Sequence, residues 1–207
     1  MNLPNKITLS RIFMIPVFVA VFFLDGVLPD VKGFPIAYAI AAAIFAIAAC
    51  TDFIDGHIAR SRGLVTNLGK FLDPIADKVL VSTAMILLLA MKTILFRGWS
   101  YGDELYIALA VCICVIMARE LIISAFRQIA AVNGVVMAAD KLGKIKTTFQ
   151  DVAIFFLIFA GGFVSMSSNL DKVMGIIGLV LFAVATILTV WSGISYVVKN
   201  KKVLKDA

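Results

Sequence analysis

The sequence TDFIDGHIAR occupies residues 51–60, and GKFLDPIADK follows at residues 69–78. Together they carry four aspartates in two pairs, Asp52 with Asp55 and Asp73 with Asp77. Members of a pair are three or four residues apart, so on a helix each pair projects from one face. The intervening residues, 61–68, predict a tight connection that turns the chain back. Two antiparallel helices would then direct the four carboxylates into one space.

Four carboxylates gathered in one place have an electrostatic cost that points to a ligand. Within about 5 Å of one another, carboxylates raise each other's pKa, and near a membrane they also lose hydration. Divalent cations are the simplest compensation, and oxygen donors without paired His or Cys suit Mg²⁺ or Mn²⁺. Two such cations are the usual equipment for moving a phosphoryl group between oxygens. We therefore expect a site for two divalent ions, held by Asp52, Asp55, Asp73 and Asp77.

Small residues accompany the aspartates. Gly56 and Ala59 remove side-chain bulk beside the first pair, and Gly69 does the same beside the second. The space predicts a slot in which a flat base or a pyrophosphate lies against the backbone. Arg60 can donate a fork of hydrogen bonds to phosphate oxygens.

The composition around this stretch is that of a membrane protein. The chain has 207 residues, of which 62% are hydrophobic and 15% charged, with a mean hydropathy of +1.03. Soluble domains average about 45–50% apolar and about 25% charged residues. One membrane crossing needs about 20 residues, so about six crossings fit. The net charge of +6 then indicates cytoplasmic loops that face anionic lipids, not a nucleic-acid partner.

Apolar segments predict where the chain crosses. They are residues 12–24, extended through 7–10, then 34–51, 79–96 with Lys92 as an interruption, 105–126, 152–170 and 173–198. Asp171-Lys172 is the predicted turn between the last two, although Gly161-Gly162 weakens the fifth helix. We predict an all-α integral membrane protein, a six-transmembrane-helix bundle formed as one domain by residues 1–207. It would have an interfacial segment at 1–11 and a basic tail at 199–207.

Basic residues predict the orientation, because loops retained in the cytoplasm carry an excess of them. In this assignment most Lys and Arg residues fall on the side of the two termini. The opposite side holds Lys32, Lys92, Arg97 and Lys172. Both termini and the aspartate-containing stretch are therefore expected to be cytoplasmic.

The aspartate-containing stretch resembles the signature of the CDP-alcohol phosphotransferases, Asp-x2-Asp-Gly-x2-Ala-Arg-x8-Gly-x3-Asp-x3-Asp. Every position is filled, by Asp52, Asp55, Gly56, Ala59, Arg60, Gly69, Asp73 and Asp77. The resemblance implies a CDP-linked donor and two metal ions held by the four acids. It also implies that Asp77 takes the proton from an acceptor hydroxyl. A homodimer and a place in a bacterial cytoplasmic membrane, with the active site facing the cytoplasm, are implied as well.

Further stretches resemble a bacterial branch of this family that uses CDP-diacylglycerol and sn-glycerol 3-phosphate. They are Arg119-Glu120, Arg127-Gln128 and residues 143–150. An anionic acceptor needs cations beside the metal site, and the candidates are Arg119, Lys144 and Lys146. Residues 4–11 are similar to the family's entry segment, in which Asn5, Thr8 and Arg11 share one side of a helix and would reach the nucleotide.

Alternatives differ in what the carboxylates and cations serve. An inositol phosphate acceptor is also anionic and fits the same cations. A cation-coupled transporter could use buried acids too, but it predicts acids scattered along several helices near the membrane midplane, with broken helices in matching halves. Here the four aspartates cluster at one edge and no repeat is visible, which favours a phosphotransferase.

Overall fold

The computed structural model describes residues 3–31, 34–61, 67–132, 141–163 and 169–200. Side chains at 3–4, 52–61, 67–68, 70–71, 131–132 and 141 are outside this description. The described chain is almost entirely helical. Its long helices are α1 (Leu3–Phe22), α2 (Ile36–Ser61), α3 (Asn67–Ala90), α5 (Gly102–Val132), α6 (Lys141–Gly161) and α7 (Leu170–Lys199).

Short elements join the helices at one end of the molecule. Strands β1 (Asp30–Val31) and β2 (Phe34–Pro35) pair antiparallel, with Val31 opposite Phe34, between α1 and α2. Helix α4 (Lys92–Leu95) follows α3, and Gly98 then adopts a φ of 72°, a left-handed conformation that glycine takes without strain.

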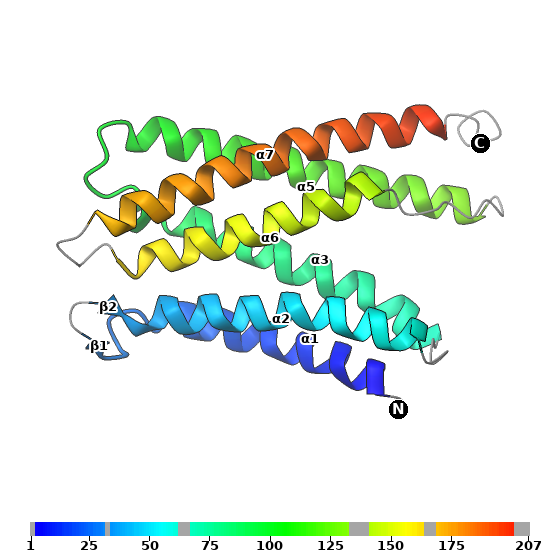
Figure 1. Cartoon of the computed structure of the whole chain (residues 1–207), viewed down its shortest axis with the longest axis horizontal. Helices are drawn as coiled ribbons and strands as arrows, with labels where there is room; N and C mark the ends of the chain where they lie inside the picture. The colour runs from blue at the N-terminus through cyan, green and yellow to red at the C-terminus, as the bar shows by residue number, and fades with distance from the viewer. Residues whose placement is uncertain (1–2, 32–33, 62–66, 133–140, 164–168, 201–207) are drawn as a thin grey trace.

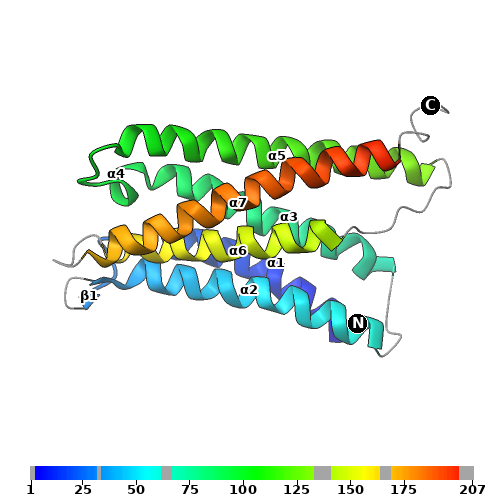
Figure 2. The same cartoon turned by 45° about the horizontal axis from the view of Figure 1, so that its top comes forward.

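The long helices run up and down in alternation (Figure 1). The start of α1, the facing ends of α2 and α3, and the end of α7 all lie at one end of the bundle. The strands and α4 lie at the opposite end (Figure 2). The predicted aspartate-containing stretch therefore lies at the same end as the start of α1 and the end of α7.

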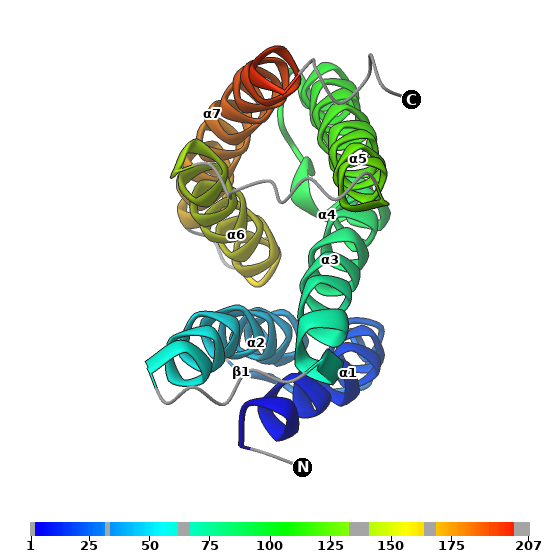
Figure 3. The same cartoon turned by 90° about the vertical axis from the view of Figure 1, so that its right-hand side faces the viewer.

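Viewed along its length, the bundle has α3 between α1 and α5 (Figure 3), and α6 contacts α2 directly. Helices α1 and α2 pack together on one side, and α6 packs against α7 on the other. Helices α1 and α2 can approach closely because Ala41, Ala42 and Ala48 of α2 are small and fully buried. The ring centroids of Phe18 on α1 and Phe45 on α2 are 6.0 Å apart. These contacts make a continuous apolar core that fixes α3 relative to its neighbours.

The outer surface of the bundle is apolar, as a lipid-facing surface requires. Large hydrophobic side chains are exposed on several helices, among them Phe13, Val17, Leu121, Ile187 and Trp191. Within the described residues, three segments are long and apolar enough to cross a membrane: Asn5–Phe22, Gly102–Ala130 and Leu170–Lys199. Ile36–Thr51 is a shorter apolar segment. The chain is thus an all-α protein with membrane-spanning helices.

One predicted connection is wrong. Asp171 and Lys172 do not form a turn, because α7 already begins at Leu170 and includes both residues. An acid in the first turn of a helix is stabilised by the positive end of the helix dipole, which explains why Asp171 belongs to the helix. Helix α6 ends at Gly161, close to the Gly161-Gly162 pair that weakens it in the sequence.

Candidate active site

The aspartate-containing stretch lies on α2 and α3, as predicted. Residues 52–60 fall in the last three turns or so of α2, and residues 69–77 fall in about the first three turns of α3. The two helices contact one another and run in opposite directions. The predicted ligands Asp52 and Asp55, with the neighbouring side chains of Gly56, Ala59 and Arg60, lie outside the described side chains.

The first helix presents a polar face to α3. Asn5, Thr8 and Arg11 are 5%, 1% and 0% exposed, so this side of α1 points into the bundle. The Thr8 hydroxyl donates a 2.6 Å hydrogen bond to Oδ1 of Asp73. The sequence places these three residues on one helix face, and the structure joins that face to the second aspartate pair. Their contact with a nucleotide stays a prediction.

Asp77, four residues after Asp73, lines a cavity of about 150 Å³ between α3, α5 and α6. Its lining is mainly apolar and includes several charged and polar side chains. The full lining comprises Asp77, Lys78, Val81, Ser82, Met85, Met117, Glu120, Leu121, Ser124, Thr147, Gln150 and Asp151. A hydroxyl-bearing molecule in this cavity would come within reach of the Asp77 carboxylate.

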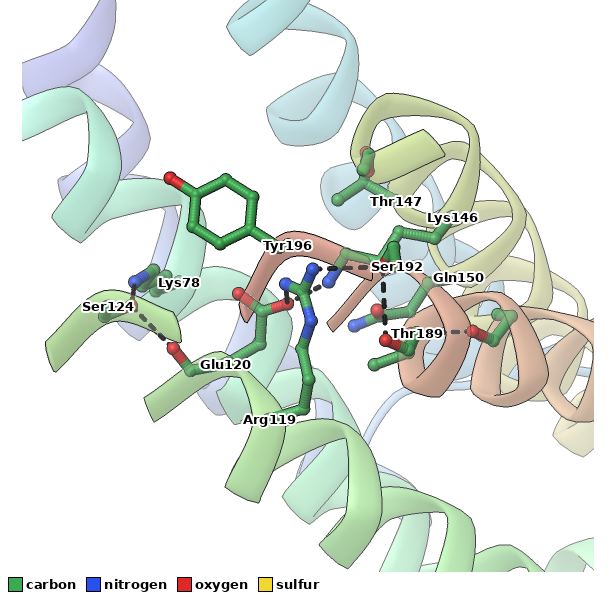
Figure 4. Close-up of polar contacts among 12 residues, drawn as sticks. Lys78, Arg119, Glu120, Ser124, Lys146, Thr147, Gln150, Thr189, Ser192 and Tyr196 are labelled. Atoms are coloured by element: carbon green, nitrogen blue, oxygen red, sulfur yellow. Dashed lines mark hydrogen bonds and ion pairs between the residues drawn. The ribbon is translucent and has the colours of Figure 1, made fainter. Parts of the chain in front are cut away.

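Glu120 is the centre of the charged groups on the far wall of this cavity. Arg119 Nη1 donates a 3.1 Å hydrogen bond to Glu120 Oε1, and Lys146 Nζ forms an ion pair with the same oxygen (Figure 4). Two of the three predicted phosphate-binding cations thus converge on one carboxylate. Glu120 itself was not a predicted site residue. Its position beside Arg119 within an apolar segment was the available signal.

Lys146 is almost fully buried, with 3% of its side chain exposed. Burial lowers the pKa of Lys146, while the carboxylates of Glu120 and Asp77 oppose that change and the charge of Arg119 adds to it. Lys146 therefore interacts electrostatically with Asp77, the predicted base, as well as with Glu120 and Arg119. Lys144, by contrast, is exposed on α6, and its backbone carbonyl accepts hydrogen bonds from Thr147 and Thr148. The structure does not bring Lys144 to Glu120.

Helix α7 holds Arg119 in place. Arg119 Nη2 donates to Ser192 Oγ at 3.0 Å. A Cβ atom on Gly193 would lie 3.1 Å from Arg119 Cγ and 3.3 Å from Nε. The Arg119 side chain therefore packs against α7 at a position where glycine leaves room for it. The sequence alone does not connect residues 119 and 193.

Lys78, the residue after Asp77, contacts α5 through its side chain. Lys78 Nζ donates to Ser124 Oγ, and Ser124 Oγ donates to the backbone carbonyl of Glu120 at 2.6 Å (Figure 4). These two hydrogen bonds connect the α3 segment that carries Asp73 and Asp77 to the α5 segment that carries Glu120.

The described donors fit a hard divalent ion. Asp73 and Asp77 supply oxygens one turn apart on α3, and Thr8 holds one oxygen of Asp73. The described residues contain no group of three His, Cys, Asp or Glu side chains that would hold a metal by itself. A complete ligand set would thus need the α2 pair, Asp52 and Asp55, whose side chains are outside the description.

Comparisons with known proteins give a consistent picture. A model of the CDP-alcohol phosphatidyltransferase family matches residues 1–191. A Bacillus subtilis protein named CDP-diacylglycerol–glycerol-3-phosphate 3-phosphatidyltransferase is 39% identical, covering 100% of this chain and 98% of its own length. Proteins of the same name from Rickettsia bellii and Shigella flexneri are 35% and 37% identical, and each match covers at least 96% of both chains.

Proposed function

The chain belongs to the CDP-alcohol phosphatidyltransferase family, and from this we propose that it makes phosphatidylglycerol phosphate. It transfers a phosphatidyl group from CDP-diacylglycerol to sn-glycerol 3-phosphate and releases CMP. The observation that supports the proposal is the cavity lined by both Asp77 and Glu120, because the Glu120 carboxylate contacts the cations Arg119 and Lys146. An acceptor with a hydroxyl at one end and a phosphate at the other suits that arrangement.

The transfer is a single displacement at phosphorus. The primary hydroxyl oxygen of the acceptor attacks the phosphorus that carries diacylglycerol, and its proton passes to the Asp77 carboxylate. The bond from this phosphorus to the bridging oxygen breaks, and CMP leaves with that oxygen. Thr8 keeps the Asp73 carboxylate in one orientation throughout. The groups that bind the cytidine end are Asn5, Thr8 and Arg11 on α1, together with Asp52, Gly56, Ala59, Arg60 and Gly69.

We assign the metal site to Asp52, Asp55, Asp73 and Asp77, with Mg²⁺ or Mn²⁺ as the ions and two ions as the number. When bound, such ions neutralise the donor diphosphate and stabilise the charge that moves onto CMP. Support comes from the hard oxygen donors on α3 and from the family to which the chain belongs.

Arg119 and Lys146 bind the acceptor phosphate in this proposal, and Lys144, exposed on the same helix as Lys146, attracts the anionic acceptor from solution. Glu120 compensates one of the two positive charges of Lys146, which is buried, and Arg119, which is largely shielded from solvent. An incoming phosphate offers the same cations more acceptor oxygens than one carboxylate does. Exchange of Glu120 for the acceptor phosphate therefore keeps both cations paired with an anion during binding.

For the membrane, we propose six spans with both termini in the cytoplasm. The described ends of α1 and α7 lie together, at the end of the bundle that also carries the aspartates (Figure 1). Helix α4, which begins at Lys92 and is followed by Arg97, lies at the opposite end (Figure 2), for which the sequence predicts fewer basic residues. The lipid tails of the donor then stay in the bilayer of a bacterial cytoplasmic membrane. A homodimer is part of the same proposal.

An acceptor panel tests the function. Purified protein is given CDP-diacylglycerol, Mg²⁺ and sn-glycerol 3-phosphate, inositol 1-phosphate or serine, and the lipid product is identified by mass spectrometry. Phosphatidylglycerol phosphate should form in preference to every other product. Preferential use of inositol 1-phosphate or serine would show that the acceptor is assigned wrongly.

A further inference from the structure

Gln150 on α6 is a buried amide that packing does not explain. Only 3% of the residue is exposed, and it lines the same cavity as Asp77 and Glu120. Its Nε2 lies 3.7 Å from the sulfur of Met85. Its Oε1 is buried and has no hydrogen-bond partner among the residues that the structure describes.

An unsatisfied buried oxygen is unfavourable, and folded proteins retain few of them. The neighbouring wall residues Val81, Met85 and Met117 are apolar, so an apolar side chain at position 150 would pack there without this penalty. The retained carbonyl oxygen is therefore suited to a hydrogen-bond donor that enters the cavity with a ligand.

The position of Gln150 indicates which group of the ligand would donate a hydrogen bond to its Oε1. Lys146 lies one helical turn earlier on α6 (Figure 4), and Asp77 on α3 lines the same cavity as Gln150. In sn-glycerol 3-phosphate the phosphate and the attacking 1-hydroxyl are at opposite ends, and the 2-hydroxyl is between them. An acceptor with its phosphate at Lys146 and its 1-hydroxyl at Asp77 therefore has its 2-hydroxyl beside the α6 wall.

We propose that Gln150 selects the acceptor by accepting a hydrogen bond from the 2-hydroxyl of sn-glycerol 3-phosphate through Oε1. The inference rests on the proposed function and assigns one further contact within it. The 1-hydroxyl does not use Gln150, because its proton goes to Asp77. An acceptor that lacks the middle hydroxyl leaves the Gln150 oxygen buried and unpaired, so the enzyme discriminates against it.

The experiment compares two acceptors in two proteins. The acceptors are sn-glycerol 3-phosphate and 3-hydroxypropyl phosphate, which differ only in the 2-hydroxyl. The proteins are the wild type and Gln150→Met, a variant of similar length and shape without the amide. Thr148→Val is the matched control, because Thr148 is exposed on the same helix and is not part of the cavity lining.

The wild type and Thr148→Val should prefer sn-glycerol 3-phosphate by about 10- to 100-fold in kcat/KM, the range expected for one buried hydrogen bond. Gln150→Met should lose that preference, because kcat/KM falls for sn-glycerol 3-phosphate and stays within about twofold for 3-hydroxypropyl phosphate. A merely structural role for Gln150 would lower both values together.

Three results would overturn the inference. One is a wild-type preference below about threefold, which would mean that the 2-hydroxyl makes no such hydrogen bond. Another is an equal fall with both acceptors in Gln150→Met or, should that variant not purify as a folded protein, in Gln150→Leu. The third is that the wild type transfers to neither acceptor, which alone would also overturn the proposed function.

Discussion

Thr8 and Asp73 are 65 positions apart in the sequence, yet the Thr8 hydroxyl lies 2.6 Å from a carboxylate oxygen of Asp73. The contact joins the polar face of α1 to the aspartate pair of α3. It means that the orientation of a predicted metal ligand depends on a helix other than the two that carry the aspartates. The first prediction follows from this contact.

Thr8→Val removes the hydroxyl donor while keeping a β-branched side chain of the same shape. A hydrogen bond to a charged group contributes about 1.5–3 kcal/mol, so kcat/KM for CDP-diacylglycerol should fall by about 10- to 150-fold. The Mg²⁺ concentration for half-maximal rate should also rise. Ser10→Ala is the control, because Ser10 is exposed and its hydroxyl donates only to the carbonyl of Ile7 on the same helix. Equal activity in both variants would argue against a role for the Thr8–Asp73 bond.

Glu120→Gln should destabilise the empty protein, because Lys146 and Arg119 lose the carboxylate that both contact. Breaking a buried ion pair costs about 3–5 kcal/mol, and the partial exposure of Glu120 places the expected loss at or below the lower end of that range. The midpoint of thermal unfolding in detergent measures this loss. Glu104→Gln, at an exposed site in the first turn of α5, should lower the midpoint much less, because it loses only the interaction with the helix dipole, about 0.3–1 kcal/mol.

The same Glu120→Gln variant tests the exchange of carboxylate for phosphate. Saturating sn-glycerol 3-phosphate should raise its unfolding midpoint more than it raises that of the wild type, because the acceptor supplies the missing anion. An equal rise in the two proteins would indicate that the acceptor phosphate does not contact the Arg119 and Lys146 cations.

Gly193→Ala adds a methyl group 3.1 Å from Arg119 Cγ, so Arg119 must move. Overpacking of this kind typically costs about 1–3 kcal/mol. We expect a higher KM for sn-glycerol 3-phosphate with an almost unchanged KM for CDP-diacylglycerol. Gly143→Ala is the matched control, since a Cβ there meets nothing within 4 Å. A rise in both KM values would point to a general loss of packing and not to a displaced Arg119.

Removal of divalent ions should abolish transfer without unfolding the protein. Excess EDTA should stop product formation, and Mg²⁺ or Mn²⁺ added beyond the chelator should restore it, because hard oxygen donors bind these ions. The circular dichroism of the helices should not change, since the apolar core does not include the aspartates. Full activity in EDTA would contradict the metal assignment.

The sequence predicts much of this arrangement because its signals are local. Helical spacing places Asp73 with Asp77 on one face, and the same spacing puts Asn5, Thr8 and Arg11 on the buried face of α1. Apolar segments also locate most of the long helices, but the fifth is predicted at 152–170 and α6 is Lys141–Gly161.

What the sequence does not predict depends on contacts between distant helices. Gly193 packs on Arg119, and Glu120 meets Lys146 of another helix; neither pair has a spacing that a sequence pattern reveals. The predicted turn at Asp171-Lys172 is wrong for a related reason. Two charged residues interrupt an apolar run there, yet an acid at the start of a helix stabilises that start.

The central claim is that Asp77 removes the acceptor proton in a cavity whose opposite wall binds the acceptor phosphate. The most direct measurement is transfer of labelled sn-glycerol 3-phosphate into lipid by the wild type and by Asp77→Asn, with binding of the acceptor measured in parallel. Rates should fall by about 10²–10⁴-fold or more in Asp77→Asn, while acceptor binding and the unfolding midpoint stay close to those of the wild type. Transfer by Asp77→Asn at a near wild-type rate would contradict the account.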